Sequence, residues 1–148
     1  EGLRLHGTAG WLLTHTDAYS FDTAAGERLT LGDRAAAHAP TYSFRVGADY
    51  EHRSGALAAF TWTATDGFYY SDSHDFRASS QQQLHTHIGY RSRDWSIRLW
   101  ARNLLDERFT TRGFYFGLEP PLYESKLYVT HGDPRQLGLT VRVEVGAG

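Results

Sequence analysis

The sequence predicts an all-β protein, a segment of an antiparallel transmembrane β-barrel that contributes about six strands. Residues 136–145 place an aliphatic side chain at every odd position and a polar residue or glycine at every even position. This is the period of a strand with one apolar face, and its ten residues are about the length a tilted strand needs to cross a bilayer. Long and short connections alternate along the chain, and aromatic residues, which form girdles in such barrels, make up 14% of it.

Six segments repeat the strand pattern. Large apolar or aromatic side chains fall on one face of each segment, and polar or small residues fall on the other. Leu12 breaks the alternation of the first segment, and Pro40 precedes the second, where a missing backbone N–H does little harm. The expected strands are residues 3–14, 41–51, 56–65, 81–91, 95–103 and 136–145.

The connections between these segments differ in length. The turns at residues 52–55 and 92–94 are short, whereas the connections at residues 15–39, 66–80 and 104–135 are long. Outer-membrane barrels have long extracellular loops and short periplasmic turns, so we expect the long connections outside the cell. The periplasmic aromatic girdle should then consist of Tyr50, Tyr90 and Trp95, and the outer girdle of Trp11, Tyr42, Phe44 and Trp62.

The composition excludes several classes of protein. Mean hydropathy is −0.49, and no stretch approaches about eighteen consecutive apolar residues, so the sequence predicts no membrane-spanning helix. Barrel strands are half polar, and this average is therefore compatible with membrane insertion. Cysteine is absent, which excludes disulfides and thiolate metal sites, and a net charge of −2 gives no reason to expect a nucleic-acid partner.

Neither an enzyme nor a cofactor site is expected. The sequence holds no nucleophile elbow, metal-hydrolase motif or glycine-rich phosphate loop. His85 and His87 project from the same face of one expected strand, but two imidazoles without a third ligand are a weak metal signal. We interpret them as polar residues of a lumen, and Asp72, His74 and Asp75, on a long connection, as solvated side chains.

Six strands are too few to close a membrane barrel. The small single-chain bacterial examples have about eight, and an open edge in lipid would leave backbone groups unpaired. The first residues of the chain have a strand's alternation and no apolar signal-peptide region. We therefore expect residues 1–148 to be a piece of a larger barrel.

Two motifs near the end of the chain are specific enough to suggest a family. Asn103-Leu104-Leu105-Asp106 leaves the fifth segment, and Gly132-Asp133-Pro134-Arg135 precedes the last one. Together with residues 39–42, 67–70 and 112–121, they resemble the C-terminal end of TonB-dependent outer-membrane receptors. In that family an Asn-Leu-Leu/Phe-Asp motif follows the penultimate strand, and a Gly-Asp/Glu-Pro-Arg segment enters the last one. The resemblance implies a bacterial outer-membrane barrel of about 22 strands.

The resemblance also implies a function and partners for the parent protein. Such a receptor takes up a scarce bulky solute, for example a ferric siderophore, a cobalamin or a glycan, with energy from the TonB complex. The implied partners are outer-membrane lipid, the barrel-assembly machinery, the TonB complex and a plug domain, which is not recognisable in residues 1–148. The family typically ends in an aromatic residue, whereas Val145 stands here before Gly146-Ala147-Gly148.

Rings and arginines on two long connections are the candidate ligand-binding residues. Exposed rings beside arginines suit a bulky ligand with aromatic, sugar or anionic groups, through stacking and bidentate hydrogen bonds. The alternative is that these rings belong to strands that extend beyond the membrane and pack against neighbouring loops. The set comprises Phe68, Tyr69, Tyr70, Arg112, Phe114, Tyr115, Phe116, Tyr123, Tyr128 and Arg135.

Two other functions stay open at this point. A passive or adhesive outer-membrane barrel would share the strand pattern and lack a plug domain. A soluble β-sandwich binding module would share the alternation, although its strands more often run to about five or six residues.

Overall fold

The computed structural model describes residues 2–23 and 25–145, which form ten β-strands and no helix. The prediction of an all-β, antiparallel protein is confirmed, whereas the end at Gly146-Ala147-Gly148 lies outside the described residues. Nowhere in these two ranges is there a helix long and apolar enough to cross a membrane. One sheet contains six strands: β1 (Gly2–Trp11), β4 (Tyr42–Glu51), β5 (Ala56–Thr65), β6 (Gln81–Arg91), β7 (Trp95–Arg102) and β10 (Gln136–Val143).

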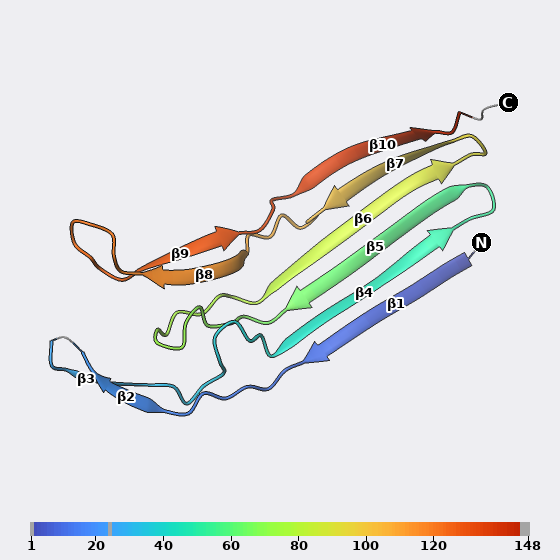
Figure 1. Ribbon diagram of the computed structural model, residues 1–148. Helices are drawn as coiled ribbons and strands as arrows, with labels where there is room; N and C mark the ends of the chain where they lie inside the picture. The colour runs from blue at the N-terminus through green and yellow to red at the C-terminus, as the bar shows by residue number, and fades with distance from the viewer. Residues whose placement is uncertain (1, 24, 146–148) are drawn as a thin grey trace.

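The six strands lie in the order β1-β4-β5-β6-β7-β10, and every neighbouring pair is antiparallel. The two short turns lie at the end of the sheet where β1 begins and β10 ends, and the three long connections lie together at the opposite end (Figure 1). The six predicted strands are therefore present, in the predicted alternation of long and short connections. The first ends at Trp11 rather than at residue 14, after which Leu12 donates its N–H to the carbonyl of Thr41.

Two of the long connections contain hairpins that the sequence analysis did not predict. The first connection carries β2 (Tyr19–Asp22) paired with β3 (Arg28–Leu31), and the last carries β8 (Thr110–Phe116) paired with β9 (Lys126–His131). The long connections predicted at residues 15–39 and 104–135 are thus present, and each contains two strands of its own. Strands of four residues show only two apolar alternations, which is too short a period to distinguish from a loop.

The register places one row of apolar residues across the whole sheet. Successive cross-strand partners in this row are Leu139, Leu99, Ile88, Ala58, Tyr50 and Leu3. Ala58 is half-buried, and the other five side chains are exposed, with Leu3 at 63%, Leu99 at 53% and Leu139 at 62%. Within the described residues the other two sheets are two-stranded ribbons at the loop end, so this apolar face has no second layer packed on it.

The opposite face of the sheet is polar, and rings on it lie against glycines. One of its rows contains Gly138, Trp100, His87, Ala59, Asp49 and Arg4. A Cβ added at Gly138 would overlap the Trp100 ring, and one added at Gly47 would overlap the His6 imidazole. Glycine is therefore required at both positions to let a ring from the neighbouring strand lie flat on the sheet.

Aromatic residues gather at both ends of the six strands. At the short-turn end the rings of Tyr90 and Trp95 are 5.6 Å apart. At the loop end Trp11 lies 6.0 Å from Tyr42, and Phe44 lies 5.0 Å from Trp62 in an edge-on arrangement. These ring pairs include six of the seven residues expected at two girdles, and the seventh, Tyr50, lies 6.3 Å from the His52 ring.

Candidate functional site

The three long connections meet at one end of the sheet and pack on one another. Tyr70, on the connection from β5 to β6, is only 5% exposed. Its ring lies over Gly113 of β8, and its hydroxyl is hydrogen-bonded to that of Thr110. Tyr70, one of the predicted ligand-binding residues, is thus buried between two loops, which favours a packing role over contact with a solute.

Arg34 ties the first long connection to the second. Its guanidinium pairs with the carboxylate of Asp75 and donates to the backbone carbonyls of Asp72 at 3.0 Å and His74 at 2.9 Å. It also lies 4.3 Å from the centre of the Tyr69 ring, within the range of a cation–π contact. A longer hydrogen bond, at 3.3 Å, runs to the Ser71 carbonyl. Arg34, whose side chain is only 11% exposed, therefore contacts five groups of the second connection.

His74 ties the second connection to the β8–β9 ribbon. Its imidazole is stacked on the Tyr115 ring, with centroids 3.5 Å apart and planes 6° from parallel. Its Nε2 is hydrogen-bonded to the Ser125 hydroxyl at 3.3 Å. Burial, then the charge of Asp75 and the neighbouring Tyr70, raise the pKa of the Tyr115 phenol. Tyr115, a predicted ligand-binding residue, therefore has one ring face occupied by the neighbouring loop.

Asp72 and Asp75 are exposed, as the interpretation of solvated side chains expects, whereas His74 is half-buried. All three also contact another loop. Asp72 accepts the backbone N–H of Ala37 at 2.8 Å, while its own carbonyl accepts the Tyr19 hydroxyl at 2.7 Å. Asp75 and His74 make the contacts described above. Sequence reasoning missed these roles, and also that of Arg34, because each partner lies between 35 and 53 residues away.

The ten predicted ligand-binding residues do not converge on one site. In the β8–β9 ribbon, Phe114 pairs with Tyr128 across the strands with ring centroids 5.8 Å apart, and Arg112 pairs with Thr130. Tyr115 follows Phe114 in β8, so its side chain points to the opposite face of the ribbon, where it contacts His74. Phe116 and Tyr123 are exposed toward the ribbon tip, and Phe68 contacts His38 at 5.2 Å on another loop. We call the surface of Arg112, Phe114, Phe116 and Tyr128 the ribbon face.

A charged cluster braces the tip of the ribbon beside this face. The carboxylate of Glu119 accepts hydrogen bonds from the Tyr128 hydroxyl at 2.6 Å and from the Lys126 ammonium at 3.1 Å. The bond from Tyr128, and then that from Lys126, lowers the pKa of Glu119, and the same carboxylate raises the pKa of Tyr128. The arrangement fixes the Tyr128 ring next to Phe114.

Arg135 belongs to a different part of the molecule. It lies at the base of the last connection, where its backbone N–H donates to the carboxylate of Asp106 at 3.0 Å and its guanidinium is 3.8 Å from the same carboxylate. Nearby, Asn103 is 2% exposed and donates from Nδ2 to the carbonyls of Glu107 at 2.9 Å and Asp133 at 3.1 Å. The two motifs quoted above for the family resemblance therefore contact each other, and Arg135 lies in that junction.

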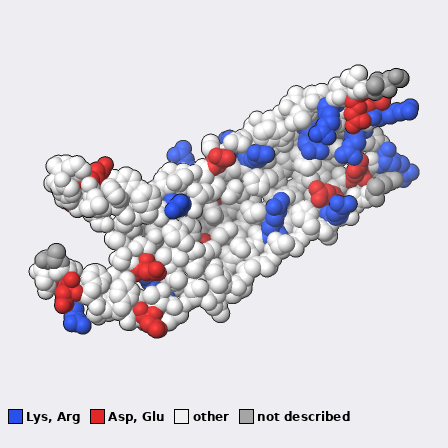
Figure 2. All heavy atoms as spheres, in the orientation of Figure 1, with Lys and Arg blue, Asp and Glu red and all other residues white. Residues whose placement is uncertain are grey.

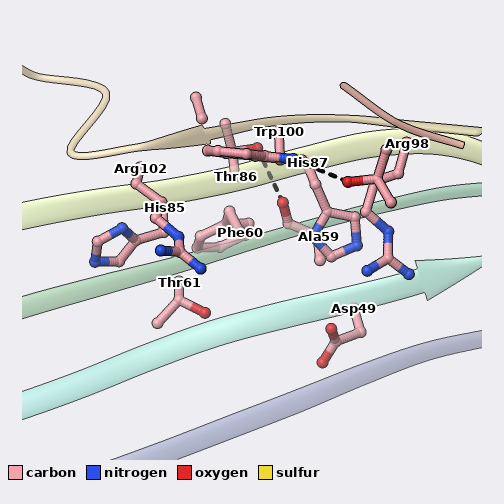
Figure 3. A pocket seen from close by; sticks show the side chains of 12 residues that line it. Asp49, Ala59, Phe60, Thr61, His85, Thr86, His87, Arg98, Trp100 and Arg102 are labelled. Atoms are coloured by element: carbon pink, nitrogen blue, oxygen red, sulfur yellow. Dashed lines mark hydrogen bonds between the residues drawn. The ribbon is translucent and has the colours of Figure 1, made fainter. Parts of the chain in front are cut away.

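Besides the ribbon face, two depressions could hold a solute. Between the loops a depression of about 510 Å³ is lined by His38, Ser71, Asp72, Arg112 and Tyr115, among others. The second is the polar face of the sheet, where a depression is lined by His85, His87, Arg98, Trp100 and Arg102 (Figure 3). His85 and His87 lie on that face as predicted, and no group of three or more potential metal ligands occurs within residues 2–23 and 25–145.

No known family model matches the chain. No solved structure matches it either.

Proposed function

We propose that this chain forms the last six strands of a TonB-dependent receptor in the bacterial outer membrane. The parent protein imports a scarce bulky solute such as a ferric siderophore, a cobalamin or a glycan. Its partners are outer-membrane lipid, the barrel-assembly machinery, its own plug domain and the TonB complex. This chain supplies barrel wall and surface loops and carries out no chemistry.

The observation that carries the membrane part of this proposal is the exposed apolar face. It runs without interruption from Leu3 on β1 to Leu139 on β10, with aromatic rings at both ends and polar residues behind it. Soluble monomers rarely expose a continuous apolar patch larger than a few hundred Å². In a barrel the same face contacts lipid, and the girdles lie at the two interfaces.

The edges of the sheet support a larger barrel. β1 and β10 each have one hydrogen-bonded neighbour among the described strands, so their outer edges have backbone groups without strand partners there. In lipid each such group is costly, and further strands of the parent would satisfy them. A receptor of about 22 strands requires about sixteen more.

The receptor part is supported by the junction between the two motifs. The Asn103 to Asp106 turn and the Gly132 to Arg135 segment meet through the Asn103 to Asp133 and Asp106 to Arg135 contacts. These contacts give a physical reason for the two motifs to occur together, because each supplies hydrogen-bond partners that the other needs.

Ligand capture is proposed for the ribbon face rather than for all ten candidate residues. Phe114 and Tyr128 present a stacked aromatic surface, and Arg112 on the same face supplies a guanidinium for an anionic or polar group. Hot-spot residues of this kind commonly cost about 2 kcal/mol or more of binding free energy when truncated. Replacing Arg112 and Phe114 by Ala in the parent should weaken binding of the transported solute, whereas Leu118→Ala at the ribbon tip serves as the exposed control.

The decisive experiment for the receptor is genetic. Reading the gene upstream of Glu1 should reveal a plug domain and the remaining strands, and deleting the gene should abolish uptake of one solute in a TonB-dependent manner. A passive or adhesive barrel would lack the plug and the TonB dependence. If the chain is instead monodisperse and monomeric without detergent, a soluble β-sandwich replaces both membrane proposals.

A further inference from the structure

Two depressions adjoin on the polar face of the six-stranded sheet, and Asp49, His87 and Arg98 line both. The depression nearer the long loops has a volume of about 350 Å³, which falls in the range of about 300–1,000 Å³ typical of small-molecule sites. Figure 3 shows His85 and Arg102 toward one side of it and His87 and Arg98 toward the other. We call this depression the Arg98 site.

The charge of the Arg98 site is strongly one-sided. Arg98 and Arg102 are four residues apart on β7 and point to the same face, so their Cα atoms are about 13 Å apart. Asp49 is the one carboxylate among its lining residues, and it lies 3.3 Å from the His6 imidazole on the neighbouring strand. Within the described residues neither guanidinium has a carboxylate in ion-pair range. Figure 2 shows basic side chains gathered toward the short-turn end of the sheet, with acidic side chains among them.

The aromatic part of the site is held in place before any solute arrives. Trp100 donates from Nε1 to the Thr140 hydroxyl at 3.1 Å, and its ring lies over Gly138. The Arg102 guanidinium lies 5.4 Å from the centre of the same ring. A ring fixed by a neighbouring strand loses little conformational entropy on binding, which favours affinity.

The protonation pattern of His85 adds a further hydrogen-bond donor. The backbone N–H of Asn103 donates to His85 Nδ1 at 3.3 Å, so the neutral imidazole accepts at Nδ1 and carries its proton on Nε2. The site therefore presents two guanidiniums and an imidazole N–H, with its single carboxylate beside another histidine. Two guanidiniums and an imidazole N–H in excess over one carboxylate favour an oxyanion.

We propose that the Arg98 site binds a small solute with at least two carboxylate or phosphate groups, one held by Arg98 and the other by Arg102, with its body against Trp100. This rests on the part of the proposed function that makes the polar face the wall of a barrel lumen. It does not depend on TonB. The charge of the two guanidiniums raises the local concentration of an anionic solute at this face.

The test uses the purified full-length parent in detergent, with citrate as the tricarboxylate probe and pyrophosphate as the phosphate probe. Titration calorimetry at low ionic strength should detect binding of at least one probe, and added salt should weaken it. Arg98→Gln and Arg102→Gln should each reduce affinity about tenfold or more, and Arg98→Lys should fall between because it keeps the charge but loses the bidentate fork. Arg93→Gln, on the β6–β7 turn, is the matched control and should bind as the parent does.

Several results would overturn this inference. One is the absence of binding of both probes, and another is unchanged affinity in Arg98→Gln. An equal loss in Arg93→Gln would show a nonspecific charge effect. Binding that arises only after the N-terminal part of the parent is removed would assign the site to an acidic polypeptide segment instead. If the barrel binds a probe but shows no TonB-dependent uptake, the Arg98 site is supported and the receptor is rejected. If the barrel shows TonB-dependent uptake but binds neither probe, the receptor is supported and the Arg98 site is rejected.

Discussion

The side-chain amide of Asn103 donates a hydrogen bond to the main-chain carbonyl of Asp133 at 3.1 Å. The bond spans 30 residues and joins the turn that leaves β7 to the segment that leads into β10, at the base of the longest connection. Asn103 has a positive φ of 45°, a conformation that Asn tolerates better than most residues. The junction joins the two ends of the connection that carries the β8–β9 ribbon.

Replacing Asn103 by Ala should destabilise this junction. The change removes two Nδ2 donations and one acceptance from the Glu107 N–H, and it leaves partly buried backbone groups without these partners. We expect a loss of about 2–3 kcal/mol in the free energy of unfolding. The measurement is the temperature at which the folded parent converts to the unfolded band on a denaturing gel. Leu105→Ala, at an exposed neighbouring position, is the control, and an equal shift in both variants would contradict the assigned role.

The facing of β10 can be tested by arginine substitutions. Val141→Arg places a charge on the apolar face and should destabilise the barrel by about 2–4 kcal/mol if the residue lies near the bilayer midplane. Thr140→Arg stays on the polar face and loses the hydrogen bond from Trp100, at a cost of about 1 kcal/mol. Urea unfolding of the parent in lipid vesicles measures both values. Equal tolerance of the two arginines would show that the facing is wrong.

The topology predicts which connections reach the cell surface. Epitope tags inserted after Gly26, after Ser73 or after Glu124 should be bound by antibody on intact cells, because all three positions lie at the long-loop end. Tags at Ser54 and Arg93 should be reached only after the outer membrane is permeabilised. Labelling of intact cells at the short turns, with protection of the long connections, would invert the orientation.

Arg34 should limit the motion of the connection at residues 66–80. Arg34→Lys keeps the positive charge but cannot reach the Asp75 carboxylate and the carbonyls of Asp72 and His74 together. We expect chymotrypsin to cleave this connection at its aromatic residues at least several-fold faster in the variant, as buried contacts are lost. Arg28→Lys, exposed on β3, is the control. Unchanged cleavage in Arg34→Lys would remove Arg34 from this role.

The brace at the ribbon tip should depend on pH in a defined window. The pKa of Glu119 lies below its ordinary 4.5, so its contribution is complete above that value and is lost as pH falls through the lowered pKa. The pKa of Tyr128 lies above its ordinary 10.0, so its contribution is complete below that value and is lost as pH rises through the raised pKa. Proteolysis of the ribbon should be slowest between these limits. Glu119→Gln should remove the acidic limb, and persistence of that limb would contradict the assignment.

The six long strands and their two faces could be predicted from the sequence alone. A strand places successive side chains on opposite faces, so a period of two in residues such as Leu137, Leu139 and Val141 already fixes which side chains share a face. The short turns between strands likewise predict that neighbouring strands are antiparallel. Because long and short connections alternate, they also predict that the long loops lie together at one end of the sheet. These features depend only on residues that are close together in the chain, so the local sequence pattern is enough to predict them.

Only the tertiary structure decided which candidate residues act together. Tyr70 was expected as an exposed ring and is buried on Gly113. Tyr115 and Phe114, adjacent in sequence, lie on opposite faces of the β8–β9 ribbon, which was not among the six predicted strands. Arg34 carried no local signal, because its partners lie on a separate loop about 40 residues away. Which loops touch depends on where the strand ends lie in space. That placement results from pairing between residues far apart in the chain, so the local periodicity of the sequence does not predict it.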